Sequence, residues 1–182
     1  MKEELDKILE GVNNWLKYAE AKNATLLAAN GLMIFGIVRI LVAWDIESIS
    51  INLYLIFVVI LLVISTTALL ISFIPYLDIP WLFKLQKPDK EKDNLLYFEH
   101  ISKYTPRVYL DSLSAAIASQ NHHGERYEFM QANQIIANSV IARRKFIIFT
   151  IAIWITIGAV ITPLFAWMIK ENYIEFKRKD RK

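Results

Sequence analysis

Three long apolar runs dominate the pattern of hydrophobic and polar positions. Residues 24–44 contain one charged side chain, Arg39, and residues 53–74 and 146–169 contain none. The hydrocarbon core of a bilayer is about 30 Å thick, and a helix of about 20 residues crosses it. All three runs are long enough, and two uncharged stretches of more than 20 residues argue against the alternative of core helices in a soluble protein. The pattern therefore predicts three transmembrane helices.

The residues before the first run have a helical period. Apolar side chains recur at spacings of three and four, and no Gly or Pro lies between Gly11 and residue 24. We therefore expect one long helix whose amphipathic part, residues 1–23, rests on other cytoplasmic helices. A helix lying on the membrane surface is the alternative, but four Lys against five acidic residues give little attraction to anionic lipid. The apolar positions are Leu5, Ile8, Leu9, Val12, Leu16 and Ala19.

The segment between the second and third runs, residues 75–145, contains several helix signals. "PYLDIPWLFKLQKPDKEKDN" is typical of an exposed connector, and "NLLYFEHISKY" is compatible with a short helix. Thr105 and Pro106 suit the N-cap and first position of a further helix, which "NHHG" ends. The following residues keep a helical period into the third run. We therefore predict an all-α membrane protein whose small cytoplasmic bundle is built from helices continuous with the first and third spans.

Basic residues are distributed unevenly around the runs. The loop 45–52 has no Lys or Arg, whereas residues 75–145 have ten. Cytoplasmic loops carry an excess of Lys and Arg, so we expect residues 1–23 and 75–145 in the cytoplasm and the loop outside. Three crossings would place the tail, residues 170–182, outside despite its six basic residues. The side of the tail therefore stays open.

Composition narrows the functional class. Of the 182 residues, 55% are hydrophobic and the mean hydropathy is +0.32, which favours a membrane protein. The absence of cysteine excludes disulfides, thiolate metal sites and a catalytic thiol. A net charge of +3 predicts no nucleic-acid partner.

Nothing in the sequence favours an enzyme. His122 and His123 are adjacent and would face different ways on a helix, and the only other histidine is His100, so a metal site is weakly supported. Acidic residues are scattered without a pair at the spacing of an acid and a base, and no serine lies in a nucleophile motif. We expect no catalytic residue, metal or cofactor.

Ligand recognition is the remaining function. One small segment combines aromatic rings with guanidinium groups, and a nucleotide is bound by stacking surfaces and cations. Ordinary packing of a helical bundle with surface arginines is the alternative. The residues are Tyr97, Phe98, Tyr104, Arg107, Tyr109, Arg126 and Tyr127.

The inner half of the first span has an unusual face. Glu20, Asn23 and Asn30 lie along one side of a helix, and Ala24 and Ala28 form a pair of small residues four apart. Small residues allow close approach of helices in lipid, and asparagine can hydrogen-bond across the contact. This face therefore predicts helix–helix contact rather than contact with lipid.

Glu20 lies where the first helix would enter the membrane. Lys22 is too far round the same helix to pair with it, so we expect a basic partner on another helix. Arg143 and Lys145, at the equivalent depth of the third span, are the candidates, although an anchoring role at the membrane surface also explains these basic residues.

Three short blocks resemble those of a known family. "AEAKNATLLAAN", "NLLYFEHISKYTPRVYLDSL" and "QIIANSVIARRKF" are similar in order and spacing to motifs of the transmembrane effectors of the pyrimidine cyclase antiphage systems, the Pycsar effector proteins. Glu20, Glu99 and Phe146 depart from the Asp, Gly and Tyr expected at those positions.

The resemblance implies a bacterial inner-membrane protein functionally linked to a nucleotide cyclase. A cyclic mononucleotide, cCMP or cUMP, would bind the cytoplasmic helices, and the membrane would then be compromised, which causes abortive infection. Asn138 and Arg143 in the third block join the ligand-binding candidates. A homo-oligomer is expected, because three spans are too few to line a wide pore; its seam would contain Glu20, Asn23, Ala24, Ala28 and Asn30.

Two alternatives stay open. An effector of the same build could answer another messenger, such as a cyclic oligonucleotide. A constitutive membrane scaffold that anchors a soluble partner belongs to a different class, and it would not depolarise the membrane when a cyclic nucleotide is supplied.

Overall fold

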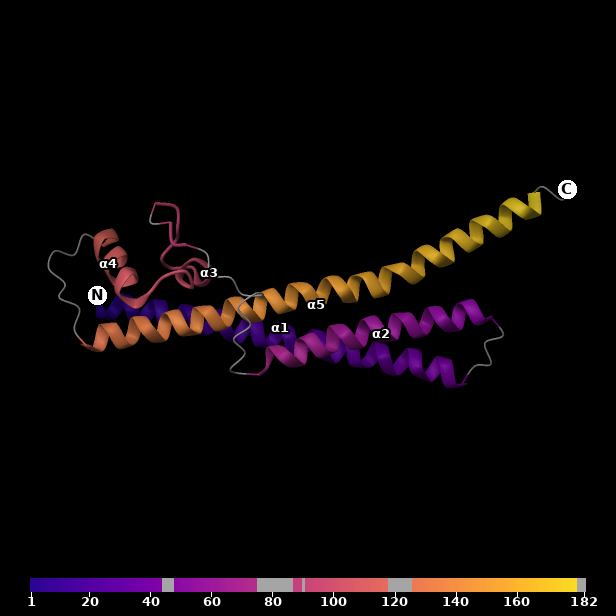
Figure 1. Cartoon of the computed structure of the whole chain (residues 1–182), viewed down its shortest axis with the longest axis horizontal. Helices are drawn as coiled ribbons and strands as arrows, with labels where there is room; N and C mark the ends of the chain where they lie inside the picture. Colours follow the sequence, from indigo (N-terminus) through magenta and orange to yellow (C-terminus); the bar gives the residue numbers. More distant parts are fainter. Residues whose placement is uncertain (44–47, 75–86, 90, 118–125, 180–182) are drawn as a thin grey trace. The chain divides into compact units, whose positions relative to one another are not determined.

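The computed structural model describes five helices. It covers residues 1–43, 48–74, 87–89, 91–117 and 126–179, and for residues 163–179 the backbone alone. No strand occurs within these ranges, so the predicted all-α class is confirmed. The helices are α1 (Lys2–Ala43), α2 (Ile49–Ser72), α3 (Phe98–Ile101), α4 (Pro106–Ala116) and α5 (Arg126–Lys179) (Figure 1).

The three longest helices are long and apolar enough to cross a membrane: α1, α2 and the part of α5 up to Thr162. As predicted, the amphipathic leader and the first apolar run form one unbroken helix, and α5 continues in the same way into the third run. The helix α2 begins at Ile49, inside the expected loop, since the Ser48 carbonyl accepts the first helical hydrogen bonds from Ile51 and Asn52.

The chain divides into two compact units. The first contains residues 1–23 and 72–149, and the second contains residues 24–71 and 150–182. The core of the first unit joins α1, α3, α4 and α5, because each helix turns one apolar face inward. Its buried side chains are Leu5, Ile8, Val12, Phe98, Ile101, Tyr104, Tyr109, Leu113, Ala132, Ile135 and Ala142.

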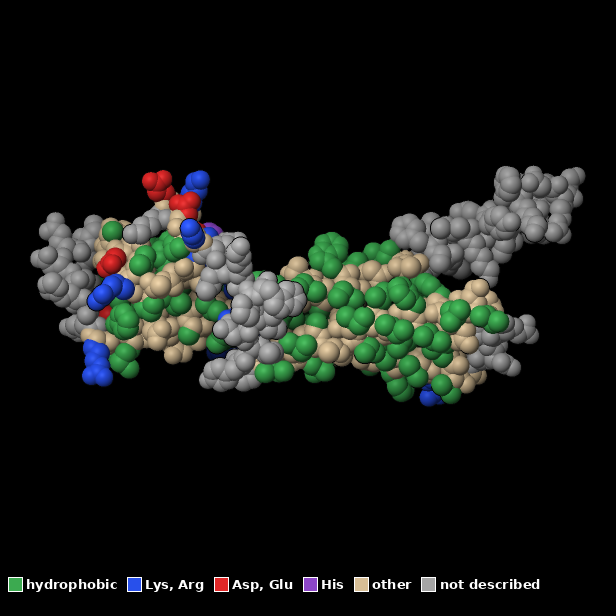
Figure 2. All heavy atoms as spheres, viewed as in Figure 1, with side chains coloured by type: hydrophobic (Ala, Val, Ile, Leu, Met, Phe, Trp, Pro, Cys, Tyr) green, Lys and Arg blue, Asp and Glu red, His purple; other side chains and the backbone are tan. Residues whose placement is uncertain are grey.

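The second unit has an apolar surface as well as an apolar core. Val58 and Leu62 of α2 pack with Ala159 of α5, and Met33 and Ile37 of α1 contact this cluster. Large hydrophobic side chains cover much of the visible surface of this unit (Figure 2). Leu32, for example, is 74% exposed. Such a surface is costly in water and suits the lipid of a membrane.

A buried polar layer links the three helices of the second unit. The Asn30 amide donates to Ser65 Oγ at 2.9 Å, and Thr156 Oγ1 donates to Asn30 Oδ1 at 3.1 Å. Ser65 Oγ also lies 2.9 Å from Thr156 Oγ1 and from the Ala152 carbonyl oxygen. Each hydrogen bond of this kind stabilises helix packing in lipid by about 0.6–2 kcal/mol.

Candidate ligand-binding region

Two of the arginines predicted to bind the ligand line one cavity in the first unit. Arg107 follows Pro106 at the start of α4, and Arg126 is the first residue of α5. Thr105 has the extended backbone of an N-cap, as predicted, although its hydroxyl makes no capping hydrogen bond. The cavity has a volume of about 470 Å³, and its other lining residues are Met1, Leu110, Asp111, Ser114, Glu128 and Phe129.

The arginine cavity suits a small anionic ligand. Both Arg107 and Arg126 are exposed, and no ion pair engages either of them within the described ranges. Arginine binds phosphate through paired N–H donors, and the two helix N-termini add a favourable dipole. Sites for small ligands typically have volumes of about 300–1,000 Å³. The carboxylates of Asp111 and Glu128 limit the cavity to ligands of low negative charge.

A second cavity, of about 690 Å³, lies against the other side of α4. Asp111 lines both cavities, so the two share one carboxylate. The second cavity has apolar walls that include Ile8, Leu95 and Leu113. Its ionisable lining residues are the acids Glu4, Asp93 and Asp111. A phosphate is therefore better placed in the arginine cavity than here.

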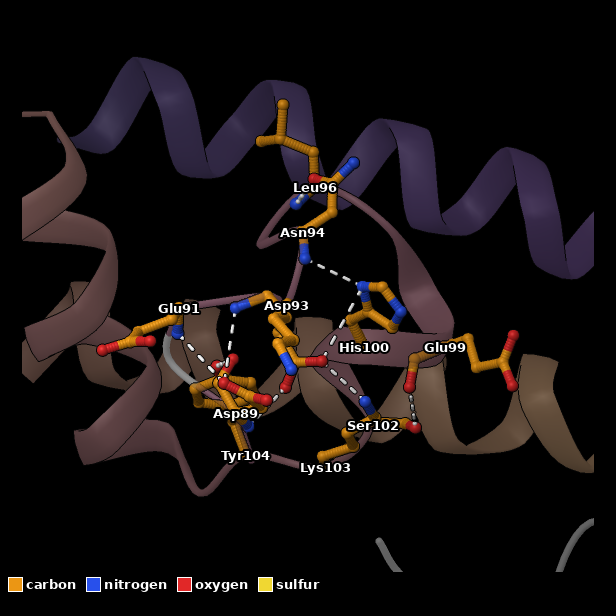
Figure 3. A network of polar contacts seen from close by, with 11 residues as sticks. Asp89, Glu91, Asp93, Asn94, Leu96, Glu99, His100, Ser102, Lys103 and Tyr104 are labelled. Atoms are coloured by element: carbon orange, nitrogen blue, oxygen red, sulfur yellow. Dashed lines mark hydrogen bonds and ion pairs between the residues drawn. The ribbon is translucent and has the colours of Figure 1, made fainter. Parts of the chain in front are cut away.

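A polar network fixes the segment that forms one wall of the second cavity (Figure 3). Asp93 accepts a hydrogen bond from Lys103 Nζ at 2.6 Å and another from the Asp89 backbone N–H at 2.8 Å. Burial by itself raises the pKa of Asp93, but the Lys103 hydrogen bond, the Asp89 N–H and the charge of Lys103 outweigh it and hold the pKa below its ordinary value. Asp93 is therefore structural and is not free to bind a ligand.

His100 belongs to the same network. Its Nδ1 accepts a hydrogen bond from the Asn94 backbone N–H at 2.8 Å, so this nitrogen is occupied by the chain itself. No group of three or more His, Asp or Glu residues with the geometry of a metal site occurs among the residues that the structure describes. His122 and His123 lie outside those residues.

Tyr104 and Tyr109 are buried in the core of the first unit. The Tyr109 hydroxyl donates to the Leu95 carbonyl at 2.8 Å, and the Tyr104 hydroxyl lies 3.5 Å from the Asp89 carbonyl. Burial raises the pKa of both phenols, and Asp93 adds to the effect at Tyr104. These rings tie α4 to the preceding segment and offer no open face for stacking a base.

Tyr97 and Phe98 join an aromatic cluster that packs into the same core. Phe98 stacks on Phe146 with ring centroids 5.1 Å apart, and Trp15 contacts Tyr97 and Phe98 at 6.0 and 5.5 Å. Trp15 is 40% exposed. Sequence reasoning missed Trp15, although a tryptophan on the polar side of an amphipathic helix is a signal that could have found it.

Asn138 and Arg143 lie elsewhere on α5. Asn138 Nδ2 donates to Asn13 Oδ1 of α1 at 2.7 Å, and its own Oδ1 accepts from Gln134 at 3.2 Å. Arg143 is half-buried, and its Nε has no hydrogen-bond partner among the described residues. The structure thus brings Arg107 to Arg126 and Tyr97 to Phe98, but it does not gather all eight predicted residues into one site.

Polar pairs join α1 to α5 at intervals of seven residues. Gln131 donates to Asp6, Asn138 to Asn13, and Lys145 Nζ lies 3.3 Å from Glu20 Oε1. The sequence-based expectation that Glu20 pairs with Arg143 or Lys145 is confirmed for Lys145. We call these three pairs the polar ladder.

The family model described as the Pycsar effector protein domain matches residues 4–170. The chain belongs to the Pycsar effector family. No curated protein matches the chain, and neither does any solved structure. Membership implies a cyclic nucleotide signal and a membrane context, and it places this protein among antiphage effectors.

In this Pycsar effector the asparagines of the first span are used inside the subunit. Asn23 and Asn30 are fully buried; Asn23 donates to Ser72 Oγ at 2.8 Å, and Asn30 bonds to Ser65. The prediction that this face makes helix–helix contacts holds within one chain. Within the single chain α2 covers Asn23, and α2 and α5 cover Asn30, while the oligomer seam itself stays a prediction. Ala24 and Ala28 are exposed on the single chain.

Proposed function

We propose that this Pycsar effector binds a cyclic mononucleotide, cCMP or cUMP, through its cytoplasmic helices and then compromises the bacterial inner membrane, which causes abortive infection. The observation that carries the proposal is the family match over residues 4–170. In this proposal the N-terminus is cytoplasmic, and a nucleotide cyclase supplies the messenger during phage infection.

The arginine cavity is the proposed messenger site. A cyclic mononucleotide carries one negative charge on its phosphodiester, and Arg107 and Arg126 supply donors that match it. Because these residues begin two different helices, a phosphodiester held by both would change the contact between α4 and α5. A ligand shifts a conformational equilibrium by its difference in affinity for the two states.

Helix continuity supports a route from messenger to membrane. Both α1 and α5 contribute residues to the first unit, which contains the arginine cavity, and to the second unit, which has a lipid-compatible surface. A change in the first unit can therefore reach the membrane without a flexible linker in either helix.

A homo-oligomer completes the proposal. Three spans cannot line a wide pore by themselves, and a small-residue face permits close helix approach in lipid. The exposed positions Ala24 and Ala28 form such a face on α1. In the proposed oligomer Glu20, Asn23 and Asn30 make contacts within each subunit, and Ala24 and Ala28 contact the neighbouring subunit.

Dye release from liposomes tests this function. The full chain is reconstituted in anionic liposomes, and cCMP or cUMP is added on the side of the first unit, with affinity measured by calorimetry. The double variant Arg107→Ala/Arg126→Ala should weaken binding by at least about tenfold, because two charge-assisted contacts are lost. Lys17→Ala, which removes an exposed charge from α1, is the matched control.

Two results would redirect the proposal. Binding without dye release would argue against membrane disruption, and no binding of either cyclic mononucleotide would argue against the messenger. Binding of a cyclic oligonucleotide in place of either mononucleotide would indicate an effector of the same build that answers another messenger. No dye release with any nucleotide would favour the constitutive membrane scaffold.

A further inference from the structure

The polar ladder has a regularity that its individual pairs do not reveal. Asp6–Gln131, Asn13–Asn138 and Glu20–Lys145 each join residues 125 positions apart. The first member of each pair follows the previous one by seven residues, and so does the second. Two parallel helices that contact each other at a seven-residue repeat have the register of a coiled coil.

An apolar seam accompanies the ladder. Leu5, Val12 and Ala19 of α1 also follow one another by seven residues, and they are fully or almost fully buried in the first unit. On α5 the residues Ala132, Ile135 and Ala142 are completely buried. The apolar side chains provide adhesion between the helices, whereas polar groups at regular positions determine the register.

Neighbouring registers do not satisfy the ladder. A slide of one helical turn, about 5.4 Å, would break all three pairs and move polar groups toward the apolar seam. A slide of seven residues, about 10.5 Å, would keep only two pairs and leave one residue at each end of the ladder without a partner, either Glu20 and Gln131 or Asp6 and Lys145. Each mismatch leaves polar groups near the interface unpaired, which is unfavourable.

We propose that the ladder locks α1 and α5 into one body, so that the signal is transmitted by movement of the pair and not by sliding of one helix along the other. This inference rests on the proposed function for the identity of the signal. The locked register itself follows from the contacts. In this mechanism α4, which carries Arg107, moves against an α1–α5 pair of fixed register.

Disulfide trapping in the chain measures the register of α1 against α5 directly. The chain has no cysteine, so introduced pairs are the only thiols. The pair Asn13→Cys/Asn138→Cys replaces side chains that are 2.7 Å apart, whereas Asn13→Cys/Ile141→Cys and Asn13→Cys/Gln134→Cys test slides of about one turn in either direction. Disulfides require Cα atoms within about 7 Å, so the pairs differ in the register that they capture.

The expected result is rapid cross-linking of the 13/138 pair, at least about tenfold faster than of either other pair, in liposomes with or without saturating cCMP or cUMP. Equal rates for the three pairs without nucleotide would overturn the lock. A rise of the 13/141 or 13/134 rate on nucleotide addition would overturn the proposed mode of transmission, because it would reveal sliding.

A functional measurement accompanies the trapping. Oxidised 13/138 protein should keep nucleotide-triggered dye release within about twofold of the reduced protein, because the bond fixes a contact that does not change. Release that is lost on oxidation and restored by reduction, with nucleotide binding retained, would overturn the inference. Failure to bind any nucleotide would instead contradict the proposed function, and the ligand-free cross-linking rates would still decide whether the register is locked.

Discussion

Glu20 Oε1 of α1 lies 3.3 Å from Lys145 Nζ of α5, and the two side chains differ sharply in exposure. Lys145 is 8% exposed, whereas the Glu20 side chain is half-exposed. Lys145 also donates to the Ser72 carbonyl at the end of α2, at 3.2 Å, and lies 5.2 Å from the centre of the Phe73 ring. One buried cation thus joins α1, α5 and the last residue of α2.

The difference in exposure predicts an asymmetric effect of mutation. Glu20→Ala should destabilise the fold by about 2 kcal/mol, because it leaves a buried ammonium group without its counter-ion. Lys145→Met should cost less, about 1 kcal/mol, since water solvates the remaining Glu20 carboxylate and methionine fills the space. Thermal unfolding in detergent measures both, and the double variant should be no less stable than Glu20→Ala. Equal and additive losses would contradict the assignment of Lys145 as the buried centre.

The buried layer of the second unit gives a second prediction. Asn30→Ala should lower stability by about 1–3 kcal/mol, because it removes two hydrogen bonds and leaves a cavity among α1, α2 and α5. Leu32→Ala, on the exposed side of the same helix, is the control and should change stability by less than about 0.5 kcal/mol. The midpoint of unfolding in detergent reports both. A larger loss for Leu32→Ala would show that Asn30 does not hold the helices together.

The Glu20–Lys145 pair could be expected from the sequence, whereas the fate of the tyrosines could not. A glutamate at a membrane entrance needs a cation, and the helix that carries the third span offers one at the same depth. Tyr104, Tyr109 and Tyr97 look alike in the sequence. Tyr104 and Tyr109 are buried in the core and Tyr97 is half-buried beside it, and this difference depends on how α4 packs against α1 and α5, which local patterns do not specify.

The aromatic cluster also could not be predicted from local sequence patterns. Trp15, Phe98 and Phe146 come from three distant segments, and only the packed bundle brings them together. Helical periods predicted the continuity of α1 and α5, because apolar side chains recur at helical spacing from each amphipathic segment into its apolar run. The helix α5 extends to Lys179, beyond residue 169 where the third span was expected to end. Periodicity also placed Asn23 and Asn30 on one face, but it did not reveal that helices of the same chain cover that face.

Acid titration tests the network around Asp93. Its pKa is lower in the folded chain than the ordinary value of 3.8, so the unfolded chain takes up the proton first as pH falls. The stability that Asp93 contributes is therefore present above that value and is lost as pH falls through the lower folded-state pKa. The unfolding temperature of the native chain should fall more steeply below pH 3.8 than that of Asp93→Asn. Parallel curves for the native chain and Asp93→Asn would contradict the network.

The exposed alanines of α1 predict where subunits meet. Ala28→Leu should reduce the cross-linked oligomer by about tenfold, because a larger side chain prevents close approach of helices. Stability of the single chain should stay unchanged, since residue 28 is exposed there. Ala43→Leu makes the same change at the exposed end of α1 and should leave the oligomer intact. Chemical cross-linking in liposomes provides the measurement, and an unaltered oligomer with Ala28→Leu would exclude this face as the seam.

The aromatic cluster and the arginine cavity are the two candidate regions for binding the proposed messenger, and one pair of variants separates them. Trp15→Leu should lower stability by about 1–2 kcal/mol, because it removes edge contacts with Tyr97, Tyr18 and Phe146. If the messenger binds at Arg107 and Arg126, affinity for cCMP or cUMP should change by less than about twofold in Trp15→Leu and by at least about tenfold in the arginine double variant. A base stacked on Trp15 would give the opposite order, since an aromatic stacking contact contributes about 1–3 kcal/mol. Calorimetry on the two folded variants therefore decides which region senses the nucleotide.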